Sequence, residues 1–216
     1  MKKITWNTKI LSLILMLTLL VGIVPMNGIV SFAVEAEEHY YEPSEEEPAG
    51  AVSVSVDGET NYYSSLRDAI DNSVDGALIT LHDNIDEDGE VQDVHSDITI
   101  DLNGFAFGGI SFRVFSGVTV KDSSDDGSGR INQNPGICVF NVYKNELETG
   151  SLTIESGTFE FNSIMIDDGA SVVISGGLFE KNVQFSCAFD ETMGSVSISG
   201  GTFVKGIDAK NVNLSS

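Results

Sequence analysis

A short segment recurs along the second half of the chain, and this repeat limits the folds that the chain can adopt. Three copies align well: SLTIESGTFE from Ser151, SVVISGGLFE from Ser171 and SVSISGGTFV from Ser195. Their spacing of 20 and 24 residues is typical of one turn of a solenoid, which buries its apolar face only by stacking on its neighbours. Weaker copies lie at Asp97-ITID and Gly117-VTVKD, an earlier one includes Ile79 and Leu81, and a last one includes Val212 and Leu214.

Apolar and small polar residues alternate within each copy, which places the apolar side chains on one side of a strand. Gly-Gly and Ser-Gly pairs follow the strands, where a sharp corner needs the positive φ that glycine adopts freely. The pattern therefore predicts an all-β fold, a right-handed parallel β-helix of six or seven short rungs. The expected apolar columns are Ile98, Val118, Leu152, Val172 and Val196; Ile100, Val120, Ile154, Ile174 and Ile198; and Phe159, Phe179 and Phe203. The expected outward column is Thr99, Thr119, Thr153, Val173 and Ser197.

The segment before the repeats has a different pattern. Valines alternate with serines over 52–56, which predicts a half-exposed strand. Ser64 or Ser65 then precedes a short helical pattern. Because an open rung exposes unpaired backbone groups, we expect residues 51–76 to cap the N-terminal end of a β-helix that spans 77–216.

The first 50 residues are interpreted as export and tether segments. Lysines precede a nearly pure apolar run from Ile10 to Val24, and small residues follow it, so we predict a signal peptide over 1–33. A retained signal anchor is the alternative. Residues 34–50 contain seven glutamates and two prolines, which indicates an acidic disordered linker. We therefore expect a secreted, extracellular protein, with association to the cell surface left open.

The charge of the chain excludes some classes of partner. Eleven Lys and Arg stand against 33 Asp and Glu, a net charge of −22. Loss of residues 1–33 removes three lysines and no acid, which makes the net charge −25. A nucleic-acid binder presents a basic surface, and anionic lipids also attract basic segments. We expect an extracellular glycan or a surface protein as partner, no nucleic acid, and no membrane once the signal is cleaved.

The two cysteines, Cys138 and Cys187, both align with Ile164 in the repeat. They would then lie two rungs apart, about 10 Å at normal strand spacing, which exceeds the reach of a disulfide. We predict two buried thiols. A disulfide is the alternative, because the exterior of the cell is oxidising.

Two acidic segments, NIDEDG and DSSDDG, resemble the first half of a calcium-binding loop. Neither has a glutamate at the twelfth position, so neither is an EF-hand. Asp86, Asp88, Asp122 and Asp126 are the candidates for weak calcium binding, the only cofactor considered. The alternative is that aspartate and glycine only form turns in these segments.

The N-terminal strand and helix, then ITIDLNG, VKDSSDDGSG and the GGTF repeats, resemble secreted parallel β-helix proteins of Gram-positive bacteria, within the pectin-lyase-like fold. The resemblance spans residues 51–216 and implies the fold more specifically than the function, because the family includes lyases, adhesins and surface proteins. Lyases of this fold type abstract a proton with Arg or Lys beside acid-bound calcium. Among the cations here, the resemblance points to Lys121, Arg113 and Arg130.

We predict a non-catalytic secreted or cell-surface module for binding or adhesion, with a β-helix face or the 122–150 loops as contact surface. The alternative is a calcium-dependent polysaccharide (uronate) lyase or a related carbohydrate-active enzyme. Asp101, Lys121 and Glu155 alternate in sign and are expected to pair along the stack, which is a structural arrangement. No residue is assigned a catalytic role. An open rung near Asn211 is the expected place for self-association.

Overall fold

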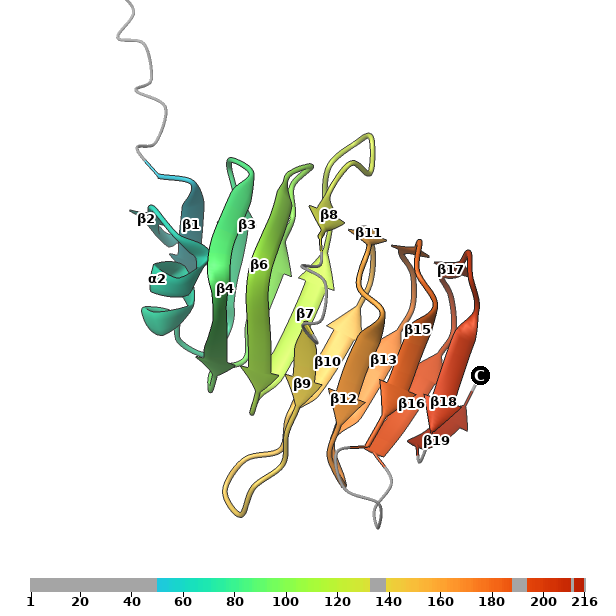
Figure 1. The fold of residues 1–216 in the computed structure, drawn as a ribbon. Coiled ribbons are helices and arrows are strands. Elements are labelled where there is room, and N and C mark those ends of the chain that lie inside the picture. Colours follow the sequence, from blue (N-terminus) through green and yellow to red (C-terminus); the bar gives the residue numbers. More distant parts are fainter. Residues whose placement is uncertain (1–49, 133–138, 188–193, 211, 216) are drawn as a thin grey trace, which may run out of the picture. The chain divides into compact units, whose positions relative to one another are not determined.

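The computed structural model describes residues 50–132, 139–187, 194–210 and 212–215, without the side chains of Asp88 and Glu90. The predicted signal peptide and almost all of the linker lie outside these residues, as does Cys138. The described residues form a parallel β-solenoid of about six turns (Figure 1), which confirms the predicted parallel β-helix.

One wall of the solenoid is a sheet of nine described strands, to which each turn adds one parallel strand. The stronger repeat copies form these strands, because their alternation buries one side of each strand. In spatial order the strands are β19 (Val212–Ser215), β16 (Gly194–Ile198), β13 (Ser171–Ile174), β10 (Ser151–Ile154), β7 (Gly117–Lys121), β5 (Ile98–Asp101), β3 (Ala77–Leu81), β1 (Val52–Val56) and β2 (Glu59–Tyr63).

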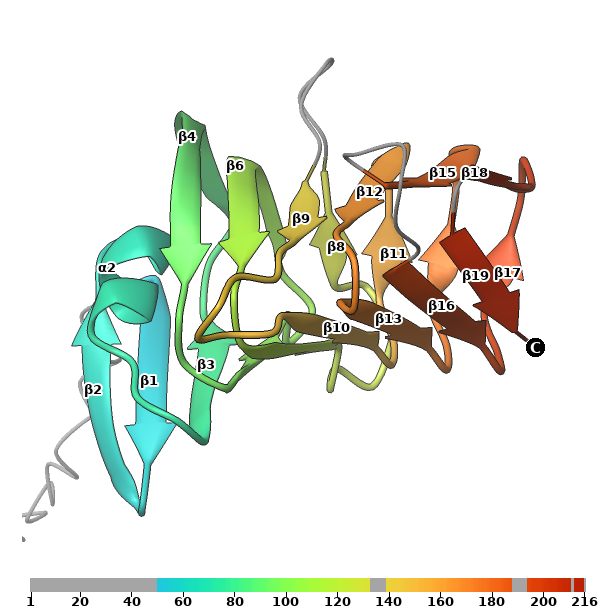
Figure 2. The same cartoon turned by 90° about the horizontal axis from the view of Figure 1, so that it is seen from below.

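The remaining strands form a second sheet of ten, seen from another side in Figure 2. Two long strands cross its width, and each later turn replaces them with two short strands separated by a bend. In spatial order they are β17 (Thr202–Phe203), β14 (Leu178–Phe179), β11 (Thr158–Phe159), β8 (Arg130–Ile131), β6 (Ala106–Val114), β9 (Phe140–Val142), β12 (Ser163–Ile166), β15 (Val183–Ser186) and β18 (Ile207–Lys210), with β4 (Ile85–Val94) beside β6.

The three predicted columns form part of the core, which also includes buried side chains of the helix and of the second sheet such as Leu66, Phe140 and Ile164. Ile198 and Phe203, at the ends of two columns, are only partly buried. Strand registers place the aliphatic columns in line from turn to turn. The phenylalanine column lies in the second sheet, where Phe159 stacks on Phe179 with ring centroids 4.9 Å apart, and Phe179 on Phe203 at 4.5 Å. Stacked identical side chains bury their faces on each other, so the turns share one continuous apolar core.

The spacing of the copies predicts Ile79 level with Ile98 and Val212 level with Val196, and both rungs differ from this register. Ala77 lies opposite Ile98, so the first rung begins two residues before Ile79. At the other end, Leu214 lies opposite Val196. Alanine is a weak apolar signal in a sequence. For this reason the apolar alternation predicts a first rung that begins at Ile79 and not at Ala77.

The segment before the first turn contains an antiparallel hairpin and a helix. Strands β1 and β2 meet at Asp57 and Gly58, which both have positive φ, and β1 also pairs antiparallel with β3. The predicted helix is α2 (Leu66–Asp71), and the Ser65 hydroxyl accepts a hydrogen bond from the Asp68 N–H at 3.0 Å. The alternation over 52–56 and the helical pattern after Ser65 predict β1 and α2, whereas β2, whose side chains are mostly exposed, has no such pattern.

The register of the second sheet corrects the alignment of the cysteines. Phe140 and Phe185, not the cysteines, lie opposite Ile164. Cys187 follows the end of β15 and is a partly exposed free thiol, so the prediction that it fills a core position is wrong. The larger phenylalanines occupy the core positions that the alignment gave to sulfur.

Candidate functional site

The largest break in the register of the second sheet lies between its two long strands. Asp86 of β4 is opposite Gly108 of β6, and Glu90 is opposite Ile110. Residues 87–89 therefore face a single residue of β6, which makes a bulge. Such bulges redirect side chains and are frequent next to functional sites.

Gly109 is the residue that the bulge requires. Its φ is +71°, and a Cβ built on it would collide with the carbonyl group of Glu87. The Glu87 side chain turns toward the helix, where its Oε1 accepts a hydrogen bond from the Leu66 N–H at 3.1 Å. The bulge is thus fixed on one side by close backbone approach and on the other by the first residue of α2.

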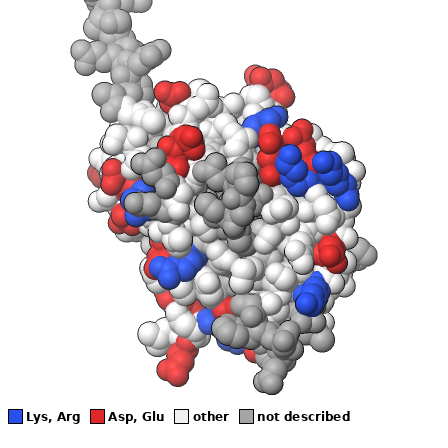
Figure 3. Space-filling view, viewed as in Figure 1, with Lys and Arg blue, Asp and Glu red and all other residues white. Residues whose placement is uncertain are grey.

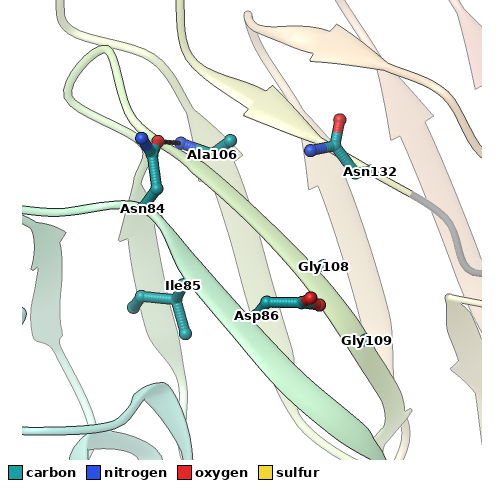
Figure 4. Close-up of a pocket in the computed structure, with 7 residues that line it drawn as sticks. All are labelled: Asn84, Ile85, Asp86, Ala106, Gly108, Gly109 and Asn132. Atoms are coloured by element: carbon teal, nitrogen blue, oxygen red, sulfur yellow. Dashed lines mark hydrogen bonds between the residues drawn. The ribbon is translucent and has the colours of Figure 1, made fainter.

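A pocket of about 430 Å³ opens beside this bulge (Figure 4). Its rim is held by Asn84, whose Oδ1 accepts a hydrogen bond from the Ala106 N–H at 2.8 Å. The pocket combines a carboxylate and two side-chain amides with bare glycine backbone. The described lining residues are Asn84, Ile85, Asp86, Ala106, Gly108, Gly109 and Asn132.

Gly108 creates the space between the polar groups of the pocket. A Cβ built on Gly108 would lie 3.4 Å from the Cβ of Asn132 and 3.7 Å from Oδ1 of Asp86. The Asp86 carboxylate and the Asn132 side chain therefore flank a position where every other residue type would place atoms. Figure 4 shows Asp86 beside the two glycines, with Asn132 on the next turn.

The same outward positions continue along the coil as an acidic strip, which we define as Asp86, Gly108, Asn132, Glu160 and Glu180. Backbone hydrogen bonds join successive turns here: the Asn132 N–H donates to the Phe107 carbonyl, and the Glu160 N–H to the Ile131 carbonyl. The strip alternates with the buried phenylalanine column, as the pleat of a strand requires. The pocket is the hollow at one end of this strip.

The three cations to which the family resemblance pointed all lie in ion pairs. The pairing of Asp101 with Lys121 across adjacent turns confirms that part of the expected charge alternation. In the view of Figure 3, acidic and basic side chains lie next to each other at several places. The pairs are Lys121 Nζ with Asp101 Oδ2 at 3.4 Å, Arg113 Nε with Asp93 Oδ1 at 2.5 Å, and Arg130 Nη1 with Glu160 Oε1 at 2.5 Å.

Asp122, a calcium candidate, accepts hydrogen bonds from its own loop and from the preceding turn of the solenoid. Its Oδ1 accepts hydrogen bonds from the Gly104 N–H at 2.9 Å and the Ser124 hydroxyl at 2.8 Å, and its Oδ2 accepts from the Gly129 N–H at 2.7 Å. Four neighbouring atoms thus use the oxygens that a cation would need, counting the Ser124 N–H at 3.2 Å. The turn-forming alternative accounts for the contacts with Ser124 and Gly129, and the contact with Gly104 joins this loop to the preceding turn of the solenoid.

Of the other calcium candidates, Asp126 lies in the same loop as Asp122, whereas Asp86 and Asp88 belong to β4. Asp126 accepts a hydrogen bond from the Ser128 N–H, and hydrogen bonds from Ser128 hold the pKa of Asp126 below its usual range. Asp86 lies in the pocket, on a different element, and the side chain of Asp88 lies outside the described residues. Within the described part of the chain, no three His, Cys, Asp or Glu side chains gather as a metal site. Calcium binding stays a prediction.

Sequence reasoning had singled out Asp86 but not its partners in the pocket. Asn84 opens the NIDEDG segment but was not itself a candidate, and Gly108 and Asn132 carry no motif. Only the glycine pair in AFGGISF, which interrupts the apolar alternation, signals the break. In the described ranges, no helix has the length and apolar character needed to cross a membrane.

Comparison of the chain with protein-family models, with curated proteins and with solved structures found no match.

Proposed function

We propose that the chain is a non-catalytic, secreted or cell-surface module that binds a neutral glycan, and that the pocket at Asp86 takes one sugar unit. The observation that carries the proposal is the pair formed by Asp86 and Asn132 on either side of the bare backbone of Gly108. It supplies convergent polar groups in a concave site, which is the usual form of a small-ligand pocket.

The chemistry of the lining suits sugar hydroxyl groups. A hydroxyl both donates and accepts hydrogen bonds; the Asp86 carboxylate accepts, and the Asn132 amide does both. A bond from a hydroxyl to an ionised carboxylate is about twice as strong as a neutral one. The volume of about 430 Å³ falls within the range of roughly 300–1,000 Å³ that is typical of ligand pockets.

The charge of the strip favours a neutral sugar over a uronate. Asp86 and Glu180 place carboxylates along one line, with Glu160 between them paired to Arg130, and the whole chain carries a net charge of −22. A polyuronate would approach this surface against electrostatic repulsion. We therefore expect neutral hexose units in the pocket and along the strip.

Two features favour binding over turnover. Glycoside hydrolysis commonly uses two carboxyl groups that flank the scissile bond, whereas Asp86 is the one carboxylate among the described lining residues. Lyase chemistry would need a cation as base, and Lys121, Arg113 and Arg130 each lie against a carboxylate. An ion-paired cation more often has a structural role.

The experiment is a glycan array that carries neutral, amino and uronic-acid sugars, probed with the purified chain in calcium and again in chelator. We expect binding to neutral glycans that survives the chelator. Gly108→Ala, which fills the space between Asp86 and Asn132, should weaken binding at least tenfold, and Asp86→Asn by a smaller factor. Thr153→Val, on the outer side of the nine-stranded sheet, is the matched surface control and should bind normally.

Two outcomes would overturn the proposal. Calcium-dependent binding to uronic-acid glycans with formation of unsaturated products would favour the lyase alternative. Binding to no glycan would instead direct the search to a surface protein.

A further inference from the structure

Strand β2 is an exposed edge of the nine-stranded sheet. Within the described ranges it pairs only with β1, in an antiparallel hairpin whose five residue pairs run without a bulge. Its side chains are exposed, except that of Tyr63, which is half-buried. Natural edge strands are commonly blunted by lysine, proline or a bulge, and the segment ETNYY has none of the three. An edge without these guards is a template for another strand.

The geometry of the hairpin decides which backbone groups of β2 face outward. The hairpin turns through two residues, Asp57 and Gly58, so the pair next to the turn exchanges hydrogen bonds. Along an antiparallel pair, residues that bond the partner strand alternate with residues whose backbone groups point away. Thr60 and Tyr62 therefore direct their N–H and C=O groups away from β1, to a side on which no described strand pairs with them.

A pocket of about 440 Å³ lies beside the same strand, between the hairpin and the end of α2. Its lining combines the apolar side chains of Val56, Tyr63 and Val74 with two acidic residues, Asp57 and Glu59. The β2 residues in the lining alternate along the strand, so one side of β2 faces the pocket. The free edge and the pocket are thus two features of one surface.

We propose that β2 takes up an extended segment of another protein as an additional strand, and that this segment carries lysine or arginine at every second position. Strand addition draws its affinity from main-chain hydrogen bonds and its specificity from pockets for alternate side chains. This inference goes beyond the proposed glycan binding and does not depend on it.

The lining of the pocket selects a basic side chain. Residues that face each other across neighbouring strands point to the same side, so side chains opposite Glu59 and Tyr63 lie beside the pocket. Lysine and arginine have an apolar stem, which suits Val56 and Val74, and a charged head, which suits Glu59 and the ring of Tyr63. An acidic segment would meet the carboxylates of Asp57 and Glu59. A second copy of the chain would bring its own net charge of −22 to the contact.

The probe is an octapeptide in which threonine and lysine alternate. Its binding to the purified full chain is measured by titration calorimetry at about 0.15 M salt, where charges beyond about 8 Å are screened. We expect a Kd of roughly 10–100 µM, because one added strand is a small interface. An isomer with all its threonines before all its lysines has the same charge without the alternation, and should bind at least tenfold more weakly.

A substitution of Thr60 tests the backbone part of the proposal. Thr60→Pro removes one N–H that points away from β1, so it removes no hydrogen bond of the hairpin. It should weaken binding of the alternating peptide at least tenfold. Thr60→Val keeps the N–H and loses the hydroxyl that lies 2.9 Å from the Ser55 hydroxyl, so it is the matched control and should bind normally. Circular dichroism melting verifies that both variants are folded.

A charge reversal tests the pocket without altering the backbone. Glu59→Lys should weaken binding of the lysine peptide at least tenfold. It should also create binding to a peptide in which threonine and glutamate alternate, which the original chain should not bind. Glu146→Lys makes the same charge change on an exposed loop residue and should alter neither result.

Four results would each overturn the proposal. The first is no binding of the alternating peptide at millimolar concentration, and the second is equal binding of the isomer, which would show general charge attraction. The third is unchanged binding by a folded Thr60→Pro chain or, if that variant does not fold, by Glu59→Lys. The fourth is a dimer of the chain without peptide, seen in sedimentation velocity and lost in Thr60→Pro, which would make a second copy the occupant of this edge.

Discussion

The two sheets of the solenoid follow the same repeat, yet only one of them contains the pocket at Asp86. In the nine-stranded sheet, residues of β5, β7, β10, β13 and β16 stay in one register for five turns. In the ten-stranded sheet, the register breaks between Asp86 and Glu90 and the long strands give way to pairs of short ones. Where the strands keep one register, the sheet surface is regular. The pocket at Asp86 lies where the register is interrupted.

The largest expected effect is a loss of stability when the phenylalanine column beneath the ten-stranded sheet is truncated. Phe159 is fully buried, stacks on Phe179 and packs against the tilted ring of Phe161. Phe159→Ala should lower the free energy of unfolding by about 3–5 kcal/mol, because it removes the ring and leaves a cavity. Urea unfolding measures the change, and a loss below about 1 kcal/mol would contradict the packed column.

A smaller loss of stability is expected from a substitution in the bulge itself. Gly109→Ala should destabilise the fold by about 2–3 kcal/mol, since it combines positive φ with a collision against the Glu87 carbonyl. Gly58→Ala is the matched control, because Gly58 also has positive φ but a Cβ there meets no atom within 4 Å. It should cost only about 1 kcal/mol. Equal losses in thermal or urea unfolding would show that the bulge is not closely packed.

The smallest expected effect is on the pH dependence of stability, and it differs between a carboxylate beside one sheet and a carboxylate beside the other. Hydrogen bonds from the Ser116 hydroxyl and the Gly117 N–H lower the pKa of Asp97, which precedes β5 in the nine-stranded sheet. Its stabilisation is therefore present above the unfolded pKa, about 3.9, and is lost as the pH falls through the folded pKa. The difference in melting temperature between the original chain and Asp97→Ala should be largest near pH 7 and vanish in strong acid.

Asp167, which follows β12 in the ten-stranded sheet, sharpens this comparison because its pKa is shifted in the opposite direction. Burial raises the pKa of Asp167, so its charged form opposes folding near neutral pH. Asp167→Asn should melt at the same temperature as the original chain or higher at pH 7. A lower melting temperature for this variant would mean that the carboxylate is stabilised by a partner rather than disfavoured by burial.

Sequence reasoning predicted the parts of the fold that depend on period. Alternation at a fixed spacing placed Val118, Leu152 and Val172 in one buried column, and the structure confirms it. It did not predict β2, because an exposed edge strand such as ETNYY has no buried face to reveal it. Nor did it place Cys187, because Phe185, two residues earlier, takes the position opposite Ile164.

The candidate site was predictable only in part, for the same physical reason. Asp86 was noticed because it stands in an acidic segment, but its role depends on Gly108 and Asn132, which come from later turns. Nothing local in the sequence relates Asp86 to residues 22 and 46 positions away until the register of the coil is known. Asp122 shows the converse, since its carboxylate is used mainly by hydrogen bonds within its own loop.

The most direct test of the central claim, that the interrupted sheet holds the binding site, is an NMR titration. The isotope-labelled chain is titrated with a mixture of neutral gluco-, galacto- and manno-oligosaccharides, and backbone amide shifts are followed. We predict that the amides of Asp86, Gly108 and Asn132 shift while those of Thr119 and Thr153, in the uniform sheet, stay in place. Shifts confined to the nine-stranded sheet, or no shifts at millimolar sugar, would contradict the account.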